Sequence, residues 1–540
     1  MIKNDIFQMT CTSLGSNMEG ICHQDGMVVF VPGMLPGETS PVRIVKTQAN
    51  YAFGILDGAP TSPSDTRITP DCASYPKCGG CSARHMSYET TLIYKQKQVQ
   101  NCFHSIGHID LEVPPVLGME SPYHYRNKSA FPIGGTKDEP VLGFFAPRSH
   151  RIIPVSSCVN AMTPTDDICA AFLSWMKAHR ISSYNEEMHT GLLRHLIIRV
   201  NRQHESMVTV VARKSNVPFL KDLAQRLQPL GVKTLVLNVN AAPTNVILGQ
   251  EYLPVYGDGF LHDEILGLNF ELSPASFFQV NVAQTEKLYS LAVQFADLTP
   301  EKTAYDVYCG TGTISLLLAQ HCRQVIGIEV VPQAVENARK NAEANHIFNA
   351  DFHTGTAESL LPQLIHQTAR ADVIVVDPPR KGLDPSVIQT ICSVSPPKVV
   401  YVSCNPATLA RDAAMFLEQG YHIDRIQPVD MFCWTSDVET VCLLSKIKSA
   451  PHIDIDLDMT ELDVTAAETK ATYEEIKAYV LEHTGLKVSC LYIAQIKAKH
   501  GIIERDCYNR AKTEGNRVPK CPPEKERAIE EALRHFQMIP

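Results

Sequence analysis

The feature that most constrains this chain is an apolar run near residue 400 that stops abruptly at a cysteine. The run from Lys398 to Ser403 (KVVYVS) is rich in β-branched residues and predicts a buried strand. Asn405-Pro406 ends that strand at once, and ATLARDAAMF after it predicts a helix. A strand that leads directly into a helix is typical of a parallel α/β sheet, and Cys404 would stand at the carboxyl edge, where such folds bind ligands.

Cys404 itself has two interpretations. A lone cysteine is usually a small buried core residue. The start of the following helix, however, favours a thiolate, which is the nucleophilic form. A DPPR sequence at 377–380 and a stretch with an acidic residue after the cysteine favour the nucleophile.

The alternation of strand, turn and helix extends upstream of Cys404. TAYDVYCGTGTISLLLAQ predicts a strand, a turn and a helix, and Gly310 and Gly312 let the backbone approach a ligand closely. QVIGIEVV predicts a second strand with Glu329 near its end, where an acidic side chain accepts hydrogen bonds from ribose hydroxyls. Ser315 stands where a dinucleotide-binding pattern needs glycine. Adenosylmethionine, which has no phosphates, therefore fits better than NAD.

Two further carboxylates belong to this candidate site. Asp377 precedes two prolines, which fix a rigid turn and aim the carboxylate into the crevice. Such a turn is a feature of methyltransferases that act on planar nitrogen or carbon atoms of bases. Glu439 lies between two apolar runs, PVDMFCW and TVCLLS. A glutamate is usually a surface residue, but burial here would raise its pKa toward use as a general base.

A second cysteine group lies near the N-terminus, at Cys72, Cys78 and Cys81. The chain has 540 residues and 17 cysteines, no apolar run of membrane-spanning length and no signal peptide. We therefore expect a cytoplasmic protein with thiols in place of disulfides. Both a tetrahedral zinc site and an iron–sulfur cluster remain open, and Cys158 is the best candidate for a fourth ligand.

The rest of the chain suggests several domains. Short glycine-bounded strands over 1–57 predict a small barrel, which binds an oligonucleotide or serves only for packing. The region 70–260 predicts an α+β domain, with a helix over 88–107 that packs on the neighbouring domain. Arg126 and Lys128 beside aromatic residues suit contact with RNA, although a solvated edge strand is equally compatible. From Ser273, SPASFFQVNVAQTEKLYSLAVQFADL predicts a long helix.

The C-terminal part combines an acidic linker with helices. Residues 449–470 carry six acidic residues and one lysine, which predicts a linker. Residues 471–540 predict three helices, compatible with a helix-turn-helix in which Lys497 and Lys499 face a polyanion, or with a protein-docking bundle. The net charge of −9 restricts any nucleic-acid surface to a local patch.

Several motifs in this order make the chain similar to a known family. DGMVVFVPGMLPGE resembles a TRAM domain, an RNA-binding barrel. CGGC, FFQVN, YDVYCGTGT, DPPRKG, YVSCNPATLARD and DMF-x5-VETV resemble the RNA uracil-5-methyltransferases, in particular those that modify 23S ribosomal RNA and carry an iron–sulfur cluster. The resemblance covers about residues 5 to 447 and leaves the tail outside.

The resemblance implies a fold class and a set of sites. The protein would be multidomain α/β, with a TRAM barrel of OB type (1–57), an α+β iron–sulfur domain (70–260), a Rossmann-like methyltransferase domain (261–448) and a helical extension. Cys404 would be the nucleophile and Glu439 the base. The remaining implied ligands are, for adenosylmethionine, Gln279, Tyr308, Thr313, Glu329, Thr356 and Asp377, and, for a [4Fe–4S] cluster, Cys72, Cys78, Cys81 and Cys158. Asp437 departs from the histidine that the family commonly has there.

The expected activity is methylation of carbon 5 of a uridine in ribosomal RNA by a monomeric enzyme that does not contact membranes. Carbon 5 of uracil is a poor nucleophile, so a thiolate must first add at carbon 6, and a base must later remove the carbon 5 proton. Methylation of transfer RNA is an alternative substrate choice. A non-catalytic iron–sulfur protein that binds RNA is an alternative of another class.

Overall fold

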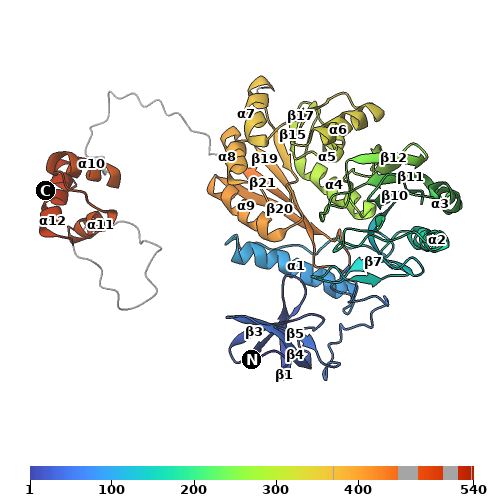
Figure 1. The fold of residues 1–540 in the computed structure, drawn as a ribbon. Coiled ribbons are helices and arrows are strands. Elements are labelled where there is room, and N and C mark those ends of the chain that lie inside the picture. Colours follow the sequence, from blue (N-terminus) through green and yellow to red (C-terminus); the bar gives the residue numbers. More distant parts are fainter. Residues whose placement is uncertain (369, 448–471, 501, 503–520, 537, 540) are drawn as a thin grey trace. The chain divides into compact units, whose positions relative to one another are not determined.

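The computed structural model describes the whole chain except residues 369, 448–471, 501, 503–520, 537 and 540 (Figure 1). The chain forms two compact units, Met1–Lys448 and Ser449–Pro540, which are described separately. The predicted acidic linker, 449–470, lies outside the described residues. Among the helices that are described, none combines the length and apolarity that crossing a bilayer requires.

The N-terminal segment folds into the predicted small barrel, in the order β1-β2-β3-β5-β4. Alternate residues of each strand point inward, so that Cys22, Val29 and Val42 are fully buried. Asp25 and Gly26, with φ of 50° and 75°, form the tight turn between the second and third strands, as expected for a hairpin. The five strands are β1 (Ile6–Leu14), β2 (Gly20–Gln24), β3 (Met27–Val31), β4 (Thr39–Thr47) and β5 (Tyr51–Leu56).

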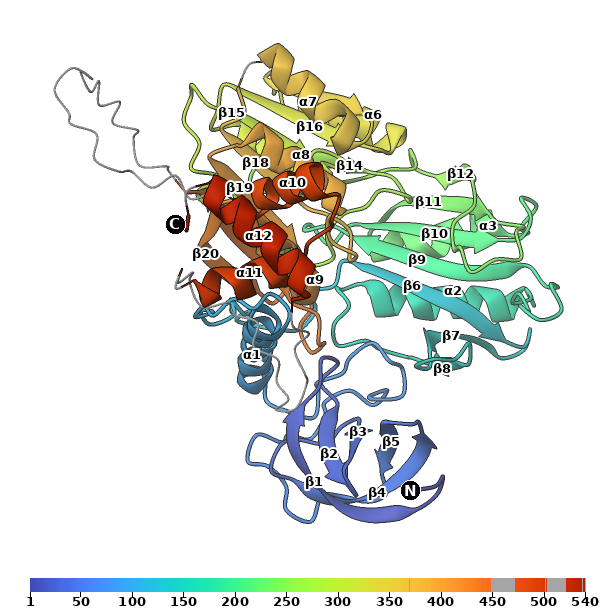
Figure 2. The same ribbon diagram turned by 90° about the vertical axis from the view of Figure 1, so that its left-hand side faces the viewer.

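Helix α1 (Tyr88–Ser105) follows the barrel in sequence but packs on the α/β domain that ends the first unit. It begins where the side chain of Ser87 accepts a hydrogen bond from the Thr90 amide. Its buried Val99 and Phe103 belong to the same apolar cluster as Leu409 of that domain. The helix thus connects distant parts of the first unit (Figures 1 and 2).

The central sheet has the strand order β12-β11-β10-β9-β6-β7-β8. The apolar runs HLIIRVN, MVTVVAR and TLVLNVN form its buried strands β9, β10 and β11, and α2 and α3 cover its apolar side. The elements are β6 (Lys128–Gly135), β7 (Pro140–Phe145), β8 (Ile152–Pro154), α2 (Thr165–Ala178), β9 (Leu193–Val200), β10 (Ser206–Ala212), α3 (Leu220–Leu227), η1 (Gln228–Leu230), β11 (Val232–Val239) and β12 (Glu251–Tyr256). A hairpin, β13 (Leu261–Ile265) and β14 (Leu268–Leu272), follows.

The second large sheet, β17-β16-β15-β18-β19-β21-β20, carries the predicted α/β pattern. Its first five strands in that order are parallel, and β21 is antiparallel to both of its neighbours. Its strands are β15 (Thr303–Val307), β16 (Gln324–Glu329), β17 (Ala350–Thr354), β18 (Val373–Val376), β19 (Lys398–Ser403), β20 (Tyr421–Val429) and β21 (Glu439–Lys446).

Successive side chains of β19 lie on opposite faces of this sheet. Val400 and Val402 of β19 join one apolar cluster, with residues of α4, α5 and α6, while Val399 and Tyr401 join the other, with residues of α7, α8 and α9. Both faces are therefore covered, as expected for a parallel sheet. The helices are α4 (Val282–Ala296), α5 (Thr313–Ala319), α6 (Pro332–Ala344), α7 (Ala357–Thr368), α8 (Pro385–Val394) and α9 (Pro406–Glu418).

One predicted boundary is wrong. The long helix does not begin at Ser273 but at Val282, because Asn281 caps its first turn by accepting a hydrogen bond from the Gln284 amide. Residues 273–281 form a loop instead, and this loop lines the cavity described below.

Within its described residues, the second unit contains three helices that pack together, α10 (Tyr473–Thr484), α11 (Cys490–Lys499) and α12 (Pro523–His535), as predicted. Of the two lysines that a helix-turn-helix would turn toward a polyanion, Lys497 is buried, whereas the side chain of Lys499 is 55% exposed. Lys497 is only 2% exposed and its Nζ lies 4.5 Å from the centre of the Tyr473 ring. Lys499 pairs with Glu526 at 2.5 Å and Glu530 at 3.1 Å. Both lysines thus have partners within the second unit, and the basic residues between 503 and 520 lie outside the described part.

Candidate active site

A cavity of about 1040 Å³ opens at the carboxyl edge of the parallel strands. All eight residues expected in the catalytic and cofactor-binding sites line it, although they come from different elements. They are Gln279, Tyr308, Thr313, Glu329, Thr356, Asp377, Cys404 and Glu439. The structure thus joins the two candidate sites into one.

Local hydrogen bonds fix Cys404 between its strand and helix. β19 ends at Ser403, and the next residue but one, Asn405, is the N-cap of α9. The Asn405 side chain accepts a hydrogen bond from the Ala407 amide (3.0 Å) and donates one to the carbonyl of Arg380 (3.1 Å). A single asparagine therefore holds the cysteine turn against the DPPR turn.

The expected thiolate character of Cys404 is wrong for the protein alone. Burial, followed by Glu439 and Asp377, raises the pKa of the Cys404 thiol to about 11, and the nearby Arg380 opposes this only in part. Desolvation and two neighbouring carboxyl groups therefore outweigh the helix start. The thiol is neutral at physiological pH until these surroundings change.

The predicted rise in the pKa of Glu439 is confirmed. Glu439 is 4% exposed, and burial, Asp377 and Asp437 raise its pKa to about 8. Burial and Asp306 raise the pKa of Asp377 to about 7. Two carboxyl groups in one cavity thus titrate near neutral pH, as acid–base catalysis requires.

The glycine turn after β15 fixes the carboxylate of Glu329, which lines the cavity. The Glu329 carboxylate accepts hydrogen bonds from the amides of Gly310 (3.2 Å) and Val331 (2.9 Å), which follow β15 and β16 respectively. Tyr308 and Gly310 have φ of 71° and 54°, so the backbone turns sharply between them. The arrangement leaves a carboxylate beside a tight backbone turn, which suits a ribose.

The central sheet holds the opposite wall. The backbone N–H and side-chain Nδ2 of Asn127 donate to the carbonyls of Val280 and Gln279, each at 2.9 Å. The Arg199 guanidinium donates to the Ser276 carbonyl at 2.7 Å. The 273–281 loop, and with it Gln279, is therefore positioned by residues outside the methyltransferase-like domain.

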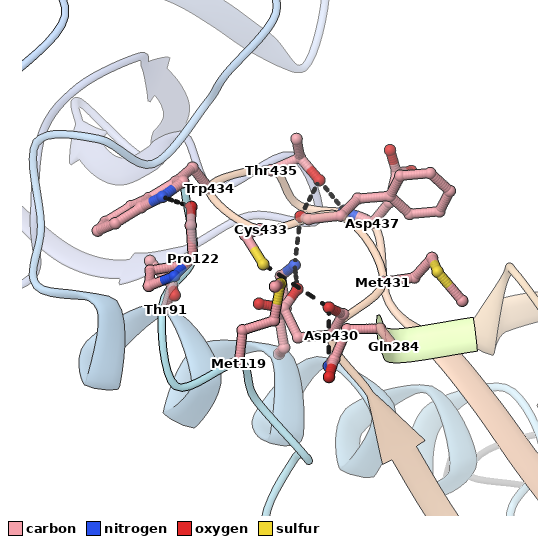
Figure 3. Close-up of polar contacts among 12 residues, drawn as sticks. Thr91, Met119, Pro122, Gln284, Asp430, Met431, Cys433, Trp434, Thr435 and Asp437 are labelled. Carbon is pink, nitrogen blue, oxygen red and sulfur yellow. Dashed lines mark hydrogen bonds and ion pairs between the residues drawn. The ribbon is translucent and has the colours of Figure 1, made fainter. Parts of the chain in front are cut away.

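The loop 430–438, most of which is drawn in Figure 3, supplies a third wall of the cavity through Phe432. Glu439, the first residue of β21, follows this loop directly. Phe432 lines the cavity, and Asp437 pairs with Arg380 at 3.0 Å. At the base of the loop, the fully buried Asp430 accepts hydrogen bonds from Lys95 (2.5 Å) and Tyr88 (2.6 Å) of α1. These hydrogen bonds thus fix the loop to helix α1, which lies more than 300 positions earlier in the chain.

The four cysteines expected to bind a cluster lie apart from this cavity. Cys81 and Cys158 influence each other electrostatically, as do Cys158 and Cys72, and the side chain of Asn160 donates to Cys81 Sγ at 3.3 Å. A methyl group on Gly80 would lie 3.8 Å from Cys78 Sγ. Within the described part of the chain, no three His, Cys, Asp or Glu side chains converge closely enough to hold a metal ion.

Sequence analysis missed three residues of the site. Asp306 is fully buried in β15, where its carboxylate accepts a hydrogen bond from Ser315 at 2.5 Å and its pKa is raised by burial to about 6. Phe432 and Arg380 line the cavity. An aspartate inside an apolar strand is a signal that could have identified Asp306, whereas nothing local distinguishes Phe432 from a core residue.

Comparison with known proteins agrees with this geometry. The tRNA (uracil-5-)-methyltransferase family profile matches residues 87–447, and the TRAM domain profile matches residues 6–56. Uncharacterized RNA methyltransferases of Clostridium tetani and Halalkalibacterium halodurans are each 42% identical, over 82% of this chain and 97% of their own length. The crystal structure of Pyrococcus abyssi tRNA (uracil-54, C5)-methyltransferase in complex with S-adenosyl-L-homocysteine superposes with a TM-score of 0.65 and 24% identity, over 81% of this chain and all of that one.

The fold and the cavity define a methyltransferase of the doubly wound α/β class, preceded by a TRAM barrel. More particularly, the chain belongs to the RNA uracil-5-methyltransferase family. The expected enzyme class is confirmed, and neither profile extends into residues 448–540.

Proposed function

We propose that this protein transfers a methyl group from S-adenosylmethionine to carbon 5 of a uridine in 23S ribosomal RNA. The observation that carries the proposal is that a cysteine and a buried glutamate face the same cavity as the predicted cofactor ligands. The reaction needs one thiol, one base and one methyl donor, and this cavity has room and residues for all three.

The residues of the chain have distinct tasks in this proposal. Bound adenosylmethionine would supply an electrophilic methyl group on a positively charged sulfonium. Glu329, Tyr308 and Asp377 would hold it. The Cys404 thiol would lose its proton to solvent and add as a thiolate to carbon 6 of the uracil, and the electron pair of the 5,6 double bond would move into an enolate that makes carbon 5 nucleophilic.

Glu439 acts later than Cys404. After carbon 5 has been methylated, its proton must leave before the carbon 6–sulfur bond can break. Glu439 accepts this proton as a carboxylate and the cysteine is released. The raised pKa of Glu439, about 8, makes it a stronger base than an exposed glutamate.

The RNA itself is proposed to bind across the barrel and the cavity, and the target uridine to be flipped out of its stack. Phe30, Tyr51 and Phe53 form a cluster on the outer face of β3 and β5, with ring centres 5.6 to 5.9 Å apart. The Arg148 guanidinium lies 5.2 Å from the centre of the Phe53 ring. Partly exposed aromatic rings beside a cation suit stacking with unpaired bases.

The proposal includes a [4Fe–4S] cluster on Cys72, Cys78, Cys81 and Cys158. Four thiols from two neighbouring segments are the right donors for it. A cubane cluster separates its ligand sulfurs more widely than a single metal ion does, because irons and sulfides lie between them. Thiols that do not converge on one point are therefore compatible with it.

Anaerobically purified protein should then be brown, with iron and sulfide in about equal amounts. Zinc in place of iron would contradict this part of the proposal.

A second substrate, transfer RNA, is supported by the tRNA enzyme of Pyrococcus abyssi, which shares the fold. Purified protein is incubated with labelled adenosylmethionine and transcripts of 23S rRNA or tRNA, which are then digested to nucleosides. Labelled 5-methyluridine in the rRNA supports the proposal, and label in tRNA alone supports the second substrate. Absence of 5-methyluridine from both would refute the activity.

A further inference from the structure

The loop that carries the proposed base is tied to the segment that follows Cys81. The carbonyl of Trp434 accepts hydrogen bonds from the amides of Ser82 (2.9 Å) and Ala83 (3.0 Å). Both donors lie within two residues of Cys81. Trp434 and Glu439 are only five residues apart in the chain. A shift of the segment after Cys81 would therefore also shift the Glu439 carboxyl group.

The Trp434 side chain is held as firmly as its backbone. It is 3% exposed and its Nε1 donates to the Pro122 carbonyl at 2.9 Å (Figure 3). The Arg84 guanidinium lies 4.9 Å from the ring, and the Tyr88 ring centre lies 5.3 Å away. Trp434 has a φ of 65°, a left-handed conformation that is unfavourable for a bulky side chain and persists only when its surroundings impose it.

The same contacts reach the thiol of Cys81. Cys81 packs against the cluster formed by Trp434, Cys433 and Tyr125. Arg84, which lies over the Trp434 ring, donates to the side-chain oxygen of Asn160, and the side chain of Asn160 donates to Cys81 in turn. One arginine and one indole therefore form a continuous path from a cysteine outside the cavity to the loop that ends at Glu439.

We propose that Trp434 is a positioning residue for Glu439, and that it transmits the chemical state of the Cys81 thiol, whether ligated or free, to the reaction cavity. This inference rests on the proposed function. It gives the cysteine segment a role in a reaction that transfers no electrons: the segment sets the geometry of proton removal and takes no part in bond making. Nucleophilic addition by Cys404 does not depend on this path, because β19 and α9 position Cys404.

Variants of the two tryptophans of the chain test the positioning role. Trp434→Ala should accumulate the covalent complex with unmodified RNA, because addition and methylation proceed but proton removal slows. We expect resolution of the complex to slow by ~10-fold or more and the Kd for adenosylmethionine to remain within twofold. Trp434→Phe keeps an aromatic ring for Arg84 and should restore part of the rate.

Trp175→Phe is the matched control, because this tryptophan lies in the core of the central sheet. It should resolve the complex at the wild-type rate. A merely structural Trp434 would lower the Tm and total activity without accumulation of the complex. Resolution at the wild-type rate by Trp434→Ala would overturn the inference.

Tryptophan fluorescence tests transmission from Cys81 independently of activity. The emission of Trp434 is obtained as the difference between the full-length protein and its Trp434→Phe variant. Cys81→Ser should shift this emission and slow resolution of the complex, whereas Cys392→Ser, on helix α8, should do neither. An unchanged emission with Cys81→Ser would refute transmission. If the wild-type protein formed no 5-methyluridine, the proposed function would fail first, and the fluorescence result would still judge the coupling.

Discussion

Two walls of the cavity, the one at the ends of the parallel strands and the one formed by the loop 430–438, differ in how the chain builds them. On one wall, Glu329, Asp377 and Cys404 each stand at or just after the end of a parallel strand, so their positions follow from the sheet itself. On the other wall, Phe432 and Glu439 depend on a loop that is anchored by α1 and by the segment after Cys81. The first wall is encoded locally, and the second requires contacts across most of the chain.

This difference assigns separate tasks to the two walls. The wall built by strand ends carries the proposed nucleophile and most of the predicted cofactor ligands. The anchored wall carries the proposed base, which the proposed reaction needs only after methyl transfer. Variants on the first wall should therefore stop the reaction before the covalent complex forms or before carbon 5 is methylated. Variants on the second wall should stop it after methylation, at proton removal.

The largest effect is expected for Cys404→Ala. Without the sulfur, carbon 5 cannot become nucleophilic, so 5-methyluridine formation should fall to the limit of detection. Covalent trapping by RNA that contains 5-fluorouridine, measured on a denaturing gel, should vanish as well. Cys392→Ala removes another half-buried cysteine outside the cavity and should retain both. Trapping by Cys404→Ala would show that the nucleophile belongs to another residue.

Glu439→Gln should still form the covalent complex but resolve it slowly, by ~10²–10⁴-fold for loss of a general base. In the wild-type protein, resolution should quicken as the pH rises toward about 8, where the carboxylate becomes the main form. Single-turnover measurements across this pH range check both expectations. A flat profile in the wild type, or normal turnover by Glu439→Gln, would remove Glu439 from its role.

Lys95→Met tests how the loop 430–438, the second of these two walls, is anchored. It leaves the fully buried Asp430 carboxylate without its cation, which costs ~3–5 kcal/mol of stability. Urea unfolding should show this loss, and resolution of the covalent complex should slow while trapping persists. The double variant Lys95→Met/Asp430→Asn removes the unpaired charge and should recover part of the stability. Equal stability of Lys95→Met and wild type would contradict the anchor.

The pH dependence of stability should separate the base from an ordinary glutamate. Folding raises the pKa of Glu439 from 4.5 to about 8, so its contribution is present while it is protonated and is lost as the pH rises through this range. Glu439→Gln should therefore match the wild type at pH 5 and have a higher Tm at pH 9. The exposed Glu418→Gln should change neither, and a lower Tm for Glu439→Gln at pH 9 would contradict the raised pKa.

The smallest effect is expected on the barrel, far from both walls. Phe53→Ala should weaken binding of RNA fragments, by ~1–3 kcal/mol for each stacked base that is lost. The affinity for adenosylmethionine should not change. Ile6→Ala alters another exposed apolar residue of the barrel and serves as the control in the same binding assay. Equal RNA affinities for the two variants would remove the aromatic face from the RNA path.

The sequence predicted the locally encoded wall far better than the anchored one. An apolar strand followed by a turn suffices to place Cys404, Asp377 and Glu329 at one sheet edge. Glu439 was identified through a flanking motif, but neither its neighbours nor the start of α4 could be derived from periodicity. The raised pKa of the Cys404 thiol was also missed, because it depends on carboxyl groups that only the folded chain brings near.

The C-terminal unit shows the same limit. The three helices described in it were predicted from the sequence. The surroundings of Lys497 and Lys499 were not, because they depend on how α11 packs against Tyr473 and α12. Helix location is a local property, whereas the exposure of a charge is a tertiary one.

The buried ion pair of Lys95 and Asp430 has a consequence for how this protein can evolve by domain recombination. An excised piece, residues 261–448, would retain the residues that line the cavity but would lose Lys95, the cation on α1 that pairs with the buried Asp430. Recombination that joined this domain to an unrelated N-terminal module would carry over a charge without its counterion. The two halves of the first unit are therefore expected to evolve together, as one heritable piece.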